Sequence, residues 1–150
     1  MRPEEWGRDG YVISTDPSML DLDAVHSFLQ RSYWAADRSL ETARRSIEHS
    51  LNFGLYRAAD RRQVGFARVV TDFATFAWLC DVFVGEEHRG RGLGVWLMQT
   101  VVAHPGLQGL RLWLLGTRDA HGLYQKVGFE RLGAPDRWMW KLGPDTTVGR

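Results

Sequence analysis

A turn rich in arginine and glycine is the part of this sequence best suited to bind an anion. It reads Arg89-Gly90-Arg91-Gly92-Leu93-Gly94 and follows an apolar segment at 76–84. Behind it, Leu93, Leu97 and Val101 recur at helical spacing, so the glycines lie where a strand becomes a helix. Glycines allow positive φ and a close backbone approach, and the first N–H groups of a helix have no partner inside the helix. The sequence therefore predicts a phosphate-binding loop at 89–94.

Two common phosphate-binding motifs do not match this loop. Gly85 and Gly90 have the glycine spacing of a P-loop, but Arg91 and Gly92 follow where Lys and Ser or Thr are required. The dinucleotide fingerprint needs Gly or Ala three residues after its second glycine, where this chain has Val95. The loop therefore matches neither a P-loop nucleoside triphosphatase nor a Rossmann dinucleotide-binding domain.

The pattern Arg-x-x-Gly-x-Gly at Arg89, Gly92 and Gly94 resembles the acetyl-coenzyme A (acetyl-CoA) pyrophosphate loop of the Gcn5-related N-acetyltransferase (GNAT) family. A second motif lies roughly 30 residues further on, at 123–129, where Leu-Tyr-Gln-Lys-Val-Gly-Phe is similar to the family signature Leu-Tyr-x-x-x-Gly-Phe. Two motifs in the right order are much harder to match by chance than one. The resemblance is to bacterial-type single-domain members and spans nearly the whole chain.

The resemblance implies acetyl-CoA as cosubstrate, an N-acetyltransferase activity and a set of binding residues. The loop would hold the pyrophosphate, and backbone at 82–84 would pair with the pantetheine arm and supply an N–H group to the oxyanion if the strand splays there. Where the family often has Asn, this chain has Thr117, which is expected to replace that contact. The implied coenzyme-binding residues are Val82, Phe83, Val84, Arg89, Gly90, Arg91, Gly92, Leu93, Gly94, Thr117 and Tyr124.

The reaction itself requires three chemical roles. An amine that attacks a thioester must lose a proton, the oxyanion must be stabilised, and the leaving thiolate must gain a proton. Tyr124 is the candidate acid, because the pKa of a phenol, about 10, is close to that of a thiol, about 8.5. By itself, its position on an apolar helical stripe with Leu123 and Val127 favours plain packing. The family signature favours the catalytic role.

Asp81 is the candidate general base. It is a carboxylate in an otherwise apolar strand, and we expect burial to raise its pKa towards amine chemistry. A structural, hydrogen-bonded Asp81 is the competing interpretation. Glu86, Glu87 and His88 in the following turn and His121 beside the Tyr124 motif are further candidates, each also consistent with a surface role.

The acceptor amine is the least determined part of the prediction. In the family it lies between the first helices and the later strands, so Tyr33 and Trp34 are its expected walls, with Trp138 or Trp140 as alternatives. Small amines, amino acids, antibiotics, and protein lysines or N-termini are all open. A different class of function is also open, namely an acetyl-CoA-binding sensor without turnover.

Composition limits the remaining possibilities. The chain has 150 residues, 44% hydrophobic and 25% charged, which is typical of one globular domain. Its net charge of +1 without a basic block does not indicate nucleic-acid binding. The absence of a long apolar run or signal-like N-terminus predicts no membrane partner and a cytoplasmic location. One cysteine and five scattered histidines predict no disulfide and no metal site. The partner is expected to be a small-molecule or peptide amine, with a homodimer as an open question.

The predicted fold is α+β, a mixed, mostly antiparallel sheet flanked by helices. Strands are expected at 11–14, 51–59, 63–70, 76–84, 110–115 and 137–141, and helices from about 22, 39, 93 and 120. Asp119 is the expected cap of the last helix and Gly128 its left-handed end. The chain would form one domain with loose ends at 1–10 and 143–150.

Overall fold

A single mixed sheet forms the centre of the molecule. The computed structural model describes residues 1–146. Six strands lie in the order β1-β2-β3-β4-β5-β6. The first five pair antiparallel and β6 pairs parallel with β5. The strands are β1 (Glu5–Arg8), β2 (Tyr11–Ser14), β3 (Leu51–Arg57), β4 (Gln63–Thr71), β5 (Phe76–Val84) and β6 (Leu112–Leu114).

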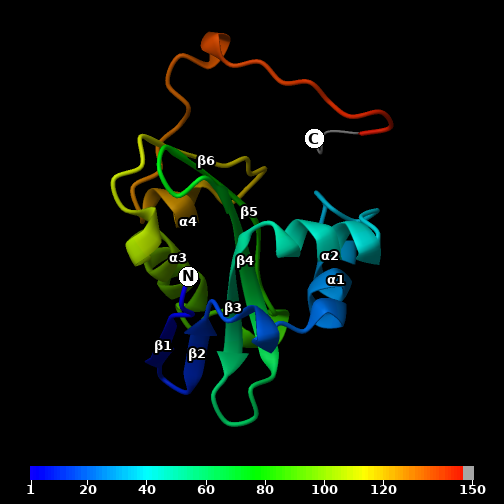
Figure 1. Cartoon of the computed structure of the whole chain (residues 1–150), viewed down its shortest axis with the longest axis vertical. Coiled ribbons are helices and arrows are strands. Elements are labelled where there is room, and N and C mark those ends of the chain that lie inside the picture. The colour runs from blue at the N-terminus through cyan, green and yellow to red at the C-terminus, as the bar shows by residue number, and fades with distance from the viewer. Residues whose placement is uncertain (147–150) are drawn as a thin grey trace.

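Helices cover both faces of this sheet (Figure 1). One pair packs on one face and the other pair on the opposite face, so the predicted mixed sheet flanked by helices is confirmed. The helices are α1 (Leu22–Gln30), α2 (Leu40–Glu48), α3 (Leu93–Ala103) and α4 (His121–Gln125), with short 3-10 turns at Pro17–Met19, Glu86–His88, Pro105–Leu107 and Pro135–Arg137.

Side chains at the helix starts explain where α1 and α2 begin. The Asp21 carboxylate accepts a hydrogen bond from the Ala24 N–H, and the Ser39 hydroxyl accepts one from the Thr42 N–H. These bonds satisfy donors that a helix leaves unpaired at its first turn. The predicted Ser39 cap is thus confirmed.

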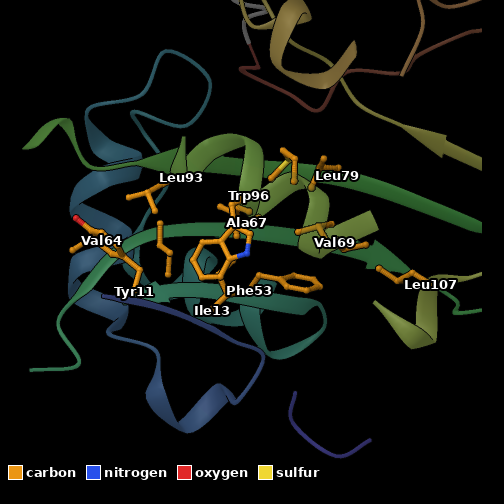
Figure 2. Close-up of a cluster of buried hydrophobic side chains, with 14 of the residues drawn as sticks. Tyr11, Ile13, Phe53, Val64, Ala67, Val69, Leu79, Leu93, Trp96 and Leu107 are labelled. Carbon is orange, nitrogen blue, oxygen red and sulfur yellow. The ribbon is translucent and has the colours of Figure 1, made fainter. Parts of the chain in front are cut away.

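Two hydrophobic clusters hold the layers together. The larger joins the sheet to α3 and α4, and Ile13, Phe53 and Val69 are fully buried in it (Figure 2). The smaller joins α1 and α2 to the other face through Val25, Leu29 and Phe66. Because each face of the sheet has its own cluster, β5 is held from both sides.

Three expectations about the chain were wrong. Residues 1–10 are not loose: β1 pairs with β2, and Trp6 stacks on Phe53 with ring centroids 6.3 Å apart. Asp119 does not cap α4: the N-cap residue is Ala120, no side chain caps the helix, and the Ala120 N–H bonds to the Thr117 hydroxyl. Residues 138–141 form no strand and lie exposed. The loose end expected at 143–150 falls partly outside the described residues.

Candidate active site

β5 carries a bulge where it pairs with β4. Phe83 is opposite Phe66, but Cys80 is opposite Arg68, so β5 carries one extra residue between these pairs. Asp81 lies in this bulge with φ of 53°, a left-handed conformation that a non-glycine residue rarely adopts. A bulge bends the strand and disrupts its ladder locally.

β5 parts from its neighbour β6 shortly before the bulge. β6 pairs with β5 only from Phe76 to Trp78. From Leu79 to Val84, β5 therefore has a free edge on its β6 side among residues 1–146. The predicted splay is present, and an extended ligand can add to this edge as a strand would.

The predicted phosphate-binding loop lies at the end of this edge. Gly90 and Gly92 have φ of 79° and 74°, and a Cβ added at either would meet no atom within 4 Å. Gly92 is the N-cap of α3 without a side-chain cap, and α3 has no acidic residue in its first turn. The loop therefore offers N–H groups and open space to an anion.

Gly94 does not need glycine's conformational freedom. It is part of α3, and a Cβ there would lie 3.8 Å from the Leu123 side chain. A small residue at Gly94 therefore lets α4 pack closely on the first turn of α3. Of the three glycines expected to adopt positive φ, only Gly90 and Gly92 do so.

A side-chain network anchors the loop to the sheet. The Arg91 guanidinium donates to the Tyr11 hydroxyl over 3.1 Å, and that hydroxyl is 2.8 Å from Nδ1 of His88. The Arg89 Nε donates to the Val84 carbonyl over 3.0 Å. Burial and the nearby Arg91 lower the pKa of His88, which keeps its ring neutral near pH 7. These contacts fix the loop relative to β2 and β5.

Residues 82–84 divide between the two faces of the sheet. Val82 and Val84 pack against the cluster under α3 and α4. The Phe83 side chain points to the other face, where its ring stacks on Phe28 with centroids 4.2 Å apart. Phe83 can therefore contact a coenzyme on the α3 side only through its backbone.

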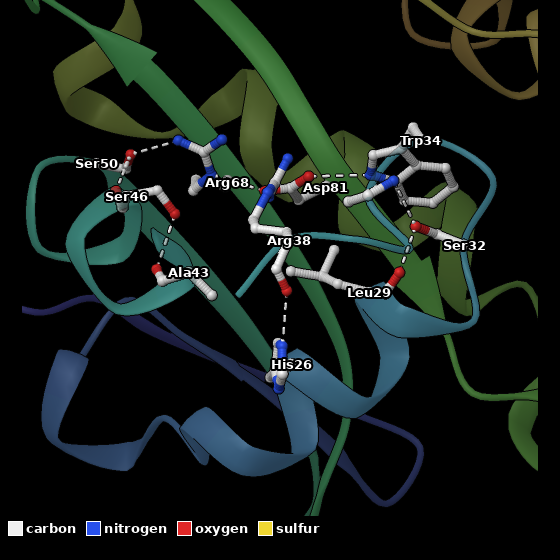
Figure 3. Close-up of polar contacts among 11 residues, drawn as sticks. His26, Leu29, Ser32, Trp34, Arg38, Ala43, Ser46, Ser50, Arg68 and Asp81 are labelled. Atoms are coloured by element: carbon white, nitrogen blue, oxygen red, sulfur yellow. Dashed lines mark hydrogen bonds and ion pairs between the residues drawn. The ribbon is translucent and has the colours of Figure 1, made fainter. Parts of the chain in front are cut away.

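Asp81 lies in a dense ion-pair network (Figure 3). Its carboxylate accepts hydrogen bonds from Arg38 over 2.6 Å, Arg68 over 2.9 Å and the Trp34 indole over 2.9 Å. Burial alone would raise the pKa of Asp81, but the two guanidinium groups outweigh burial and hold it below its usual value. The expectation of a raised pKa was wrong. A carboxylate whose oxygens are occupied by donors and whose pKa is lowered is a poor proton acceptor, so the geometry supports the structural interpretation.

Sequence reasoning missed both arginines of this network. A signal existed, because Arg68 interrupts an apolar strand just as Asp81 does, and isolated opposite charges in adjacent strands are natural partners. Arg38 carried no such signal, since it lies in a loop 43 residues from Asp81.

Tyr33 and Trp34, the predicted acceptor residues, contact both the β6–α4 connection and the β5 bulge. The Tyr33 hydroxyl accepts the Arg118 N–H over 2.8 Å, and the Arg118 guanidinium lies 4.0 Å above the Tyr33 ring. The Trp34 ring meets Tyr33 edge-on, and its indole N–H donates to Asp81. The α1–α2 connection thus reaches from the β5 bulge to the β6–α4 connection. Arg118 was not singled out from the sequence. Trp138 and Trp140, the alternative walls, lie exposed on the C-terminal segment.

Tyr124 and Thr117 both line a groove beside β6. The Tyr124 ring packs edge-on against Phe129, and burial, with smaller contributions from Tyr33, Asp119 and Cys80, raises its pKa to about 12. Its hydroxyl has no hydrogen-bond partner within residues 1–146 and is protonated at neutral pH. The Thr117 hydroxyl accepts a hydrogen bond from the Ala120 N–H, which leaves its own proton available to donate.

Cys80 is the nucleophilic side chain nearest the bulge in sequence. Burial raises the pKa of its thiol to about 11, so the thiolate is scarce at neutral pH.

Among the described residues, no group of three or more His, Cys, Asp or Glu side chains could hold a metal ion. Nor does any helix in this part of the chain combine the length and apolarity that crossing a bilayer requires.

Comparison with known proteins defines the class. The model of the acetyltransferase (GNAT) domain matches residues 52–131. A Gibberella zeae protein named as a candidate acetyltransferase is 34% identical over 146 residues, with 83% of this chain and 81% of that protein covered. The chain belongs to the GNAT family of acetyltransferases.

Solved structures agree with this assignment. A candidate GNAT acetyltransferase from Xanthomonas campestris pv. campestris is 49% identical with a TM-score of 0.86, covering 92% of this chain and 96% of that one. A predicted acetyltransferase from Clostridium acetobutylicum, solved with acetyl-CoA, shares the fold at 14% identity and a TM-score of 0.63, covering 94% of this chain and 96% of that one.

Proposed function

We propose that this acetyltransferase moves the acetyl group of acetyl-CoA to a primary amine by direct attack within a ternary complex. The observation that carries the proposal is the free edge of β5, which runs from the bulge at Asp81 to the phosphate-binding loop. Acetyl-CoA has the matching shape, with a pyrophosphate at one end of an extended arm and a thioester at the other. The Clostridium structure with acetyl-CoA supports this choice of donor.

The coenzyme would bind along this edge from loop to bulge. The N–H groups of 90–94 would receive the pyrophosphate, and backbone at 82–84 would pair with the pantetheine amides. The thioester would then lie at the bulge, where disruption of the ladder frees a backbone N–H for the oxyanion.

The amine would approach from the side of Tyr33 and Trp34. Its nitrogen forms the C–N bond to the acetyl carbon, the C–S bond breaks, and the amine's surplus proton passes to solvent. Asp81 would not take this proton; it would instead hold Trp34 and the bulge in place through its ion pairs. Direct attack is favoured over an acetyl-cysteine intermediate because Cys80 is protonated at neutral pH.

Tyr124 would assist the leaving sulfur. With a pKa raised to about 12, the phenol stays protonated at working pH and can donate a hydrogen bond to the nascent thiolate. A thiol has a pKa of about 8.5, so full proton transfer from such a phenol to the thiolate is energetically unfavourable. The contribution of Tyr124 is therefore hydrogen-bond stabilisation first, with the proton supplied finally by solvent.

Thiol release from acetyl-CoA across a panel of amines tests the function. The panel contains small amines, free amino acids and lysine-containing peptides, and product masses identify the acetylated nitrogen. Turnover with at least one amine is expected. Coenzyme binding without turnover on any amine would replace the proposal with the acetyl-CoA-binding module. No binding of acetyl-CoA would overturn both.

A further inference from the structure

The C-terminal segment 134–146 leaves the domain with its apolar side chains uncovered. In Figure 1 this segment (orange to red) runs from the α4 end of the molecule outward and across above α2. Met139 is 96% exposed and Trp140 73%, and Leu142 and Trp138 are also exposed. Monomeric domains rarely leave several large apolar side chains together in water, and such a run marks an interaction site.

A groove of about 770 Å³ lies beside β6 and has room for a further strand. One wall is residues 111–117, which contain β6, and the other is residues 127–133. β6 pairs only with β5, and residues 129–133 belong to no strand, so within residues 1–146 both walls have backbone without a ladder partner on the groove side. Trp113, Leu115 and Phe129 give this groove an apolar lining.

The segment and the groove fit one another. Residues 137–141 read Arg-Trp-Met-Trp-Lys, a short run whose aromatic residues favour a strand. Five extended residues span roughly 17 Å, the length of a typical strand and of the five-residue wall 129–133. A strand inserted here would satisfy backbone on both walls and remove the apolar side chains from water.

The hinge directs the segment away from its own groove. Only residues 134–136 connect the wall to the segment, and Ala134 has φ of 52°, followed by the 3-10 turn Pro135–Arg137. A short connection with strained backbone favours exchange of an element between copies over folding back on the same copy. A second copy offers an identical groove, and two-fold symmetry pairs two segments with two grooves.

We propose that two copies of this chain form a dimer by exchanging residues 137–141, each inserted as a strand between β6 and residues 129–133 of the other. The groove is also lined by Thr117, His121 and Tyr124, so each exchanged strand completes a wall beside the other copy's transfer site. The proposal does not depend on the chemistry, and its test uses mass and cross-linking, so either can fail without the other.

The first measurement is the mass of the full chain by analytical ultracentrifugation at micromolar concentration. A dimer is expected for the wild type, and Met139→Glu with Trp140→Glu should give a monomer, because charges replace side chains inserted in the groove. Phe73→Glu is the matched control, since it also replaces an exposed large apolar residue but lies in the β4–β5 turn. It should remain a dimer. A monomeric wild type, or a dimer that persists in the double variant, overturns the proposal.

Disulfide trapping identifies the strand that fills the groove, even if the double variant fails to fold. In a Cys80→Ser background, Leu114→Cys is combined with a cysteine at each of positions 137 to 141 in turn. At least one pair should oxidise to a species of dimer mass that reducing agent converts to monomer. A disulfide within one chain would show that the segment folds back on its own groove, and no disulfide at any position would show that it does not enter. Either result overturns the exchange.

Discussion

Replacing Asp81 by Asn tests whether this residue is structural. Asn tolerates the left-handed φ of 53° that Asp81 adopts, so the change removes the charge without imposing a new backbone conformation. Oδ1 can still accept from Trp34, but the new amide would face the guanidinium groups of Arg38 and Arg68, and donors would meet donors.

The expected loss of stability follows from the burial of the Arg68 side chain. The Arg68 side chain is only 10% exposed, so loss of its partner leaves a buried charge unpaired, which costs about 3–5 kcal/mol in comparable cases. Arg38 is more exposed at 21%, and its loss is discounted for solvent screening. We expect Asp81→Asn to lower the free energy of unfolding by about 3 kcal/mol at pH 7, measured by urea denaturation.

The pH dependence gives this prediction a sign. The pKa of Asp81 is lower in the folded protein than in the unfolded chain, where it is about 3.9. Its contribution to the stability of the fold is therefore complete above the unfolded pKa. It is lost as pH falls through the folded pKa. The gap between wild type and Asp81→Asn should thus be constant above about pH 5 and shrink below about pH 4.

An exposed ion pair supplies the control. Asp60 pairs with Arg57 at the surface, and Asp60→Asn should leave the denaturation midpoint nearly unchanged. A loss below about 1 kcal/mol in Asp81→Asn would refute the reasoning, since it would put the buried network in the range of a surface pair. A folded Asp81→Asn that loses the acid limb of the pH–rate profile would restore Asp81 as the base.

Three further predictions concern the transfer site. Gly92→Val should weaken acetyl-CoA binding by roughly tenfold or more in calorimetry, whereas Gly109→Val, with the same φ of 74° and equally open surroundings, should carry similar strain but bind normally; equal affinities would remove the loop assignment. Tyr124→Phe should lower kcat by about 10²-fold with an unchanged melting temperature, and equal rates would leave the hydroxyl without a role. Cys80→Ala should keep its activity in steady-state assays, because direct attack needs no thiolate; a variant that folds and binds coenzyme but does not turn over would contradict this.

The sequence alone determined the features that depend on near neighbours. Helix starts at Leu22 and Leu40 follow from caps within three residues, and the phosphate-binding loop follows from glycines at a strand-to-helix junction. Apolar runs and alternating patterns identified five of the six strands found in residues 1–146, and the order of the elements, which matches that of the GNAT family, implied the mixed sheet. Only the first strand was missed, because Glu5–Arg8 is short and mostly exposed and depends on pairing with β2.

Tertiary structure decided what the polar residues do. Asp81 meets Trp34 and Arg38 from 47 and 43 residues away. Burial alone would raise its pKa, but the guanidinium groups of Arg68 and Arg38 reverse that direction. No local pattern contains that information, since a pKa depends on charges brought close only by the fold. Residues 137–141 are a second case in which the local sequence does not determine the structure. Its composition favours a strand, but a strand forms only where a free edge receives it, and here the chain carries the segment away from its own.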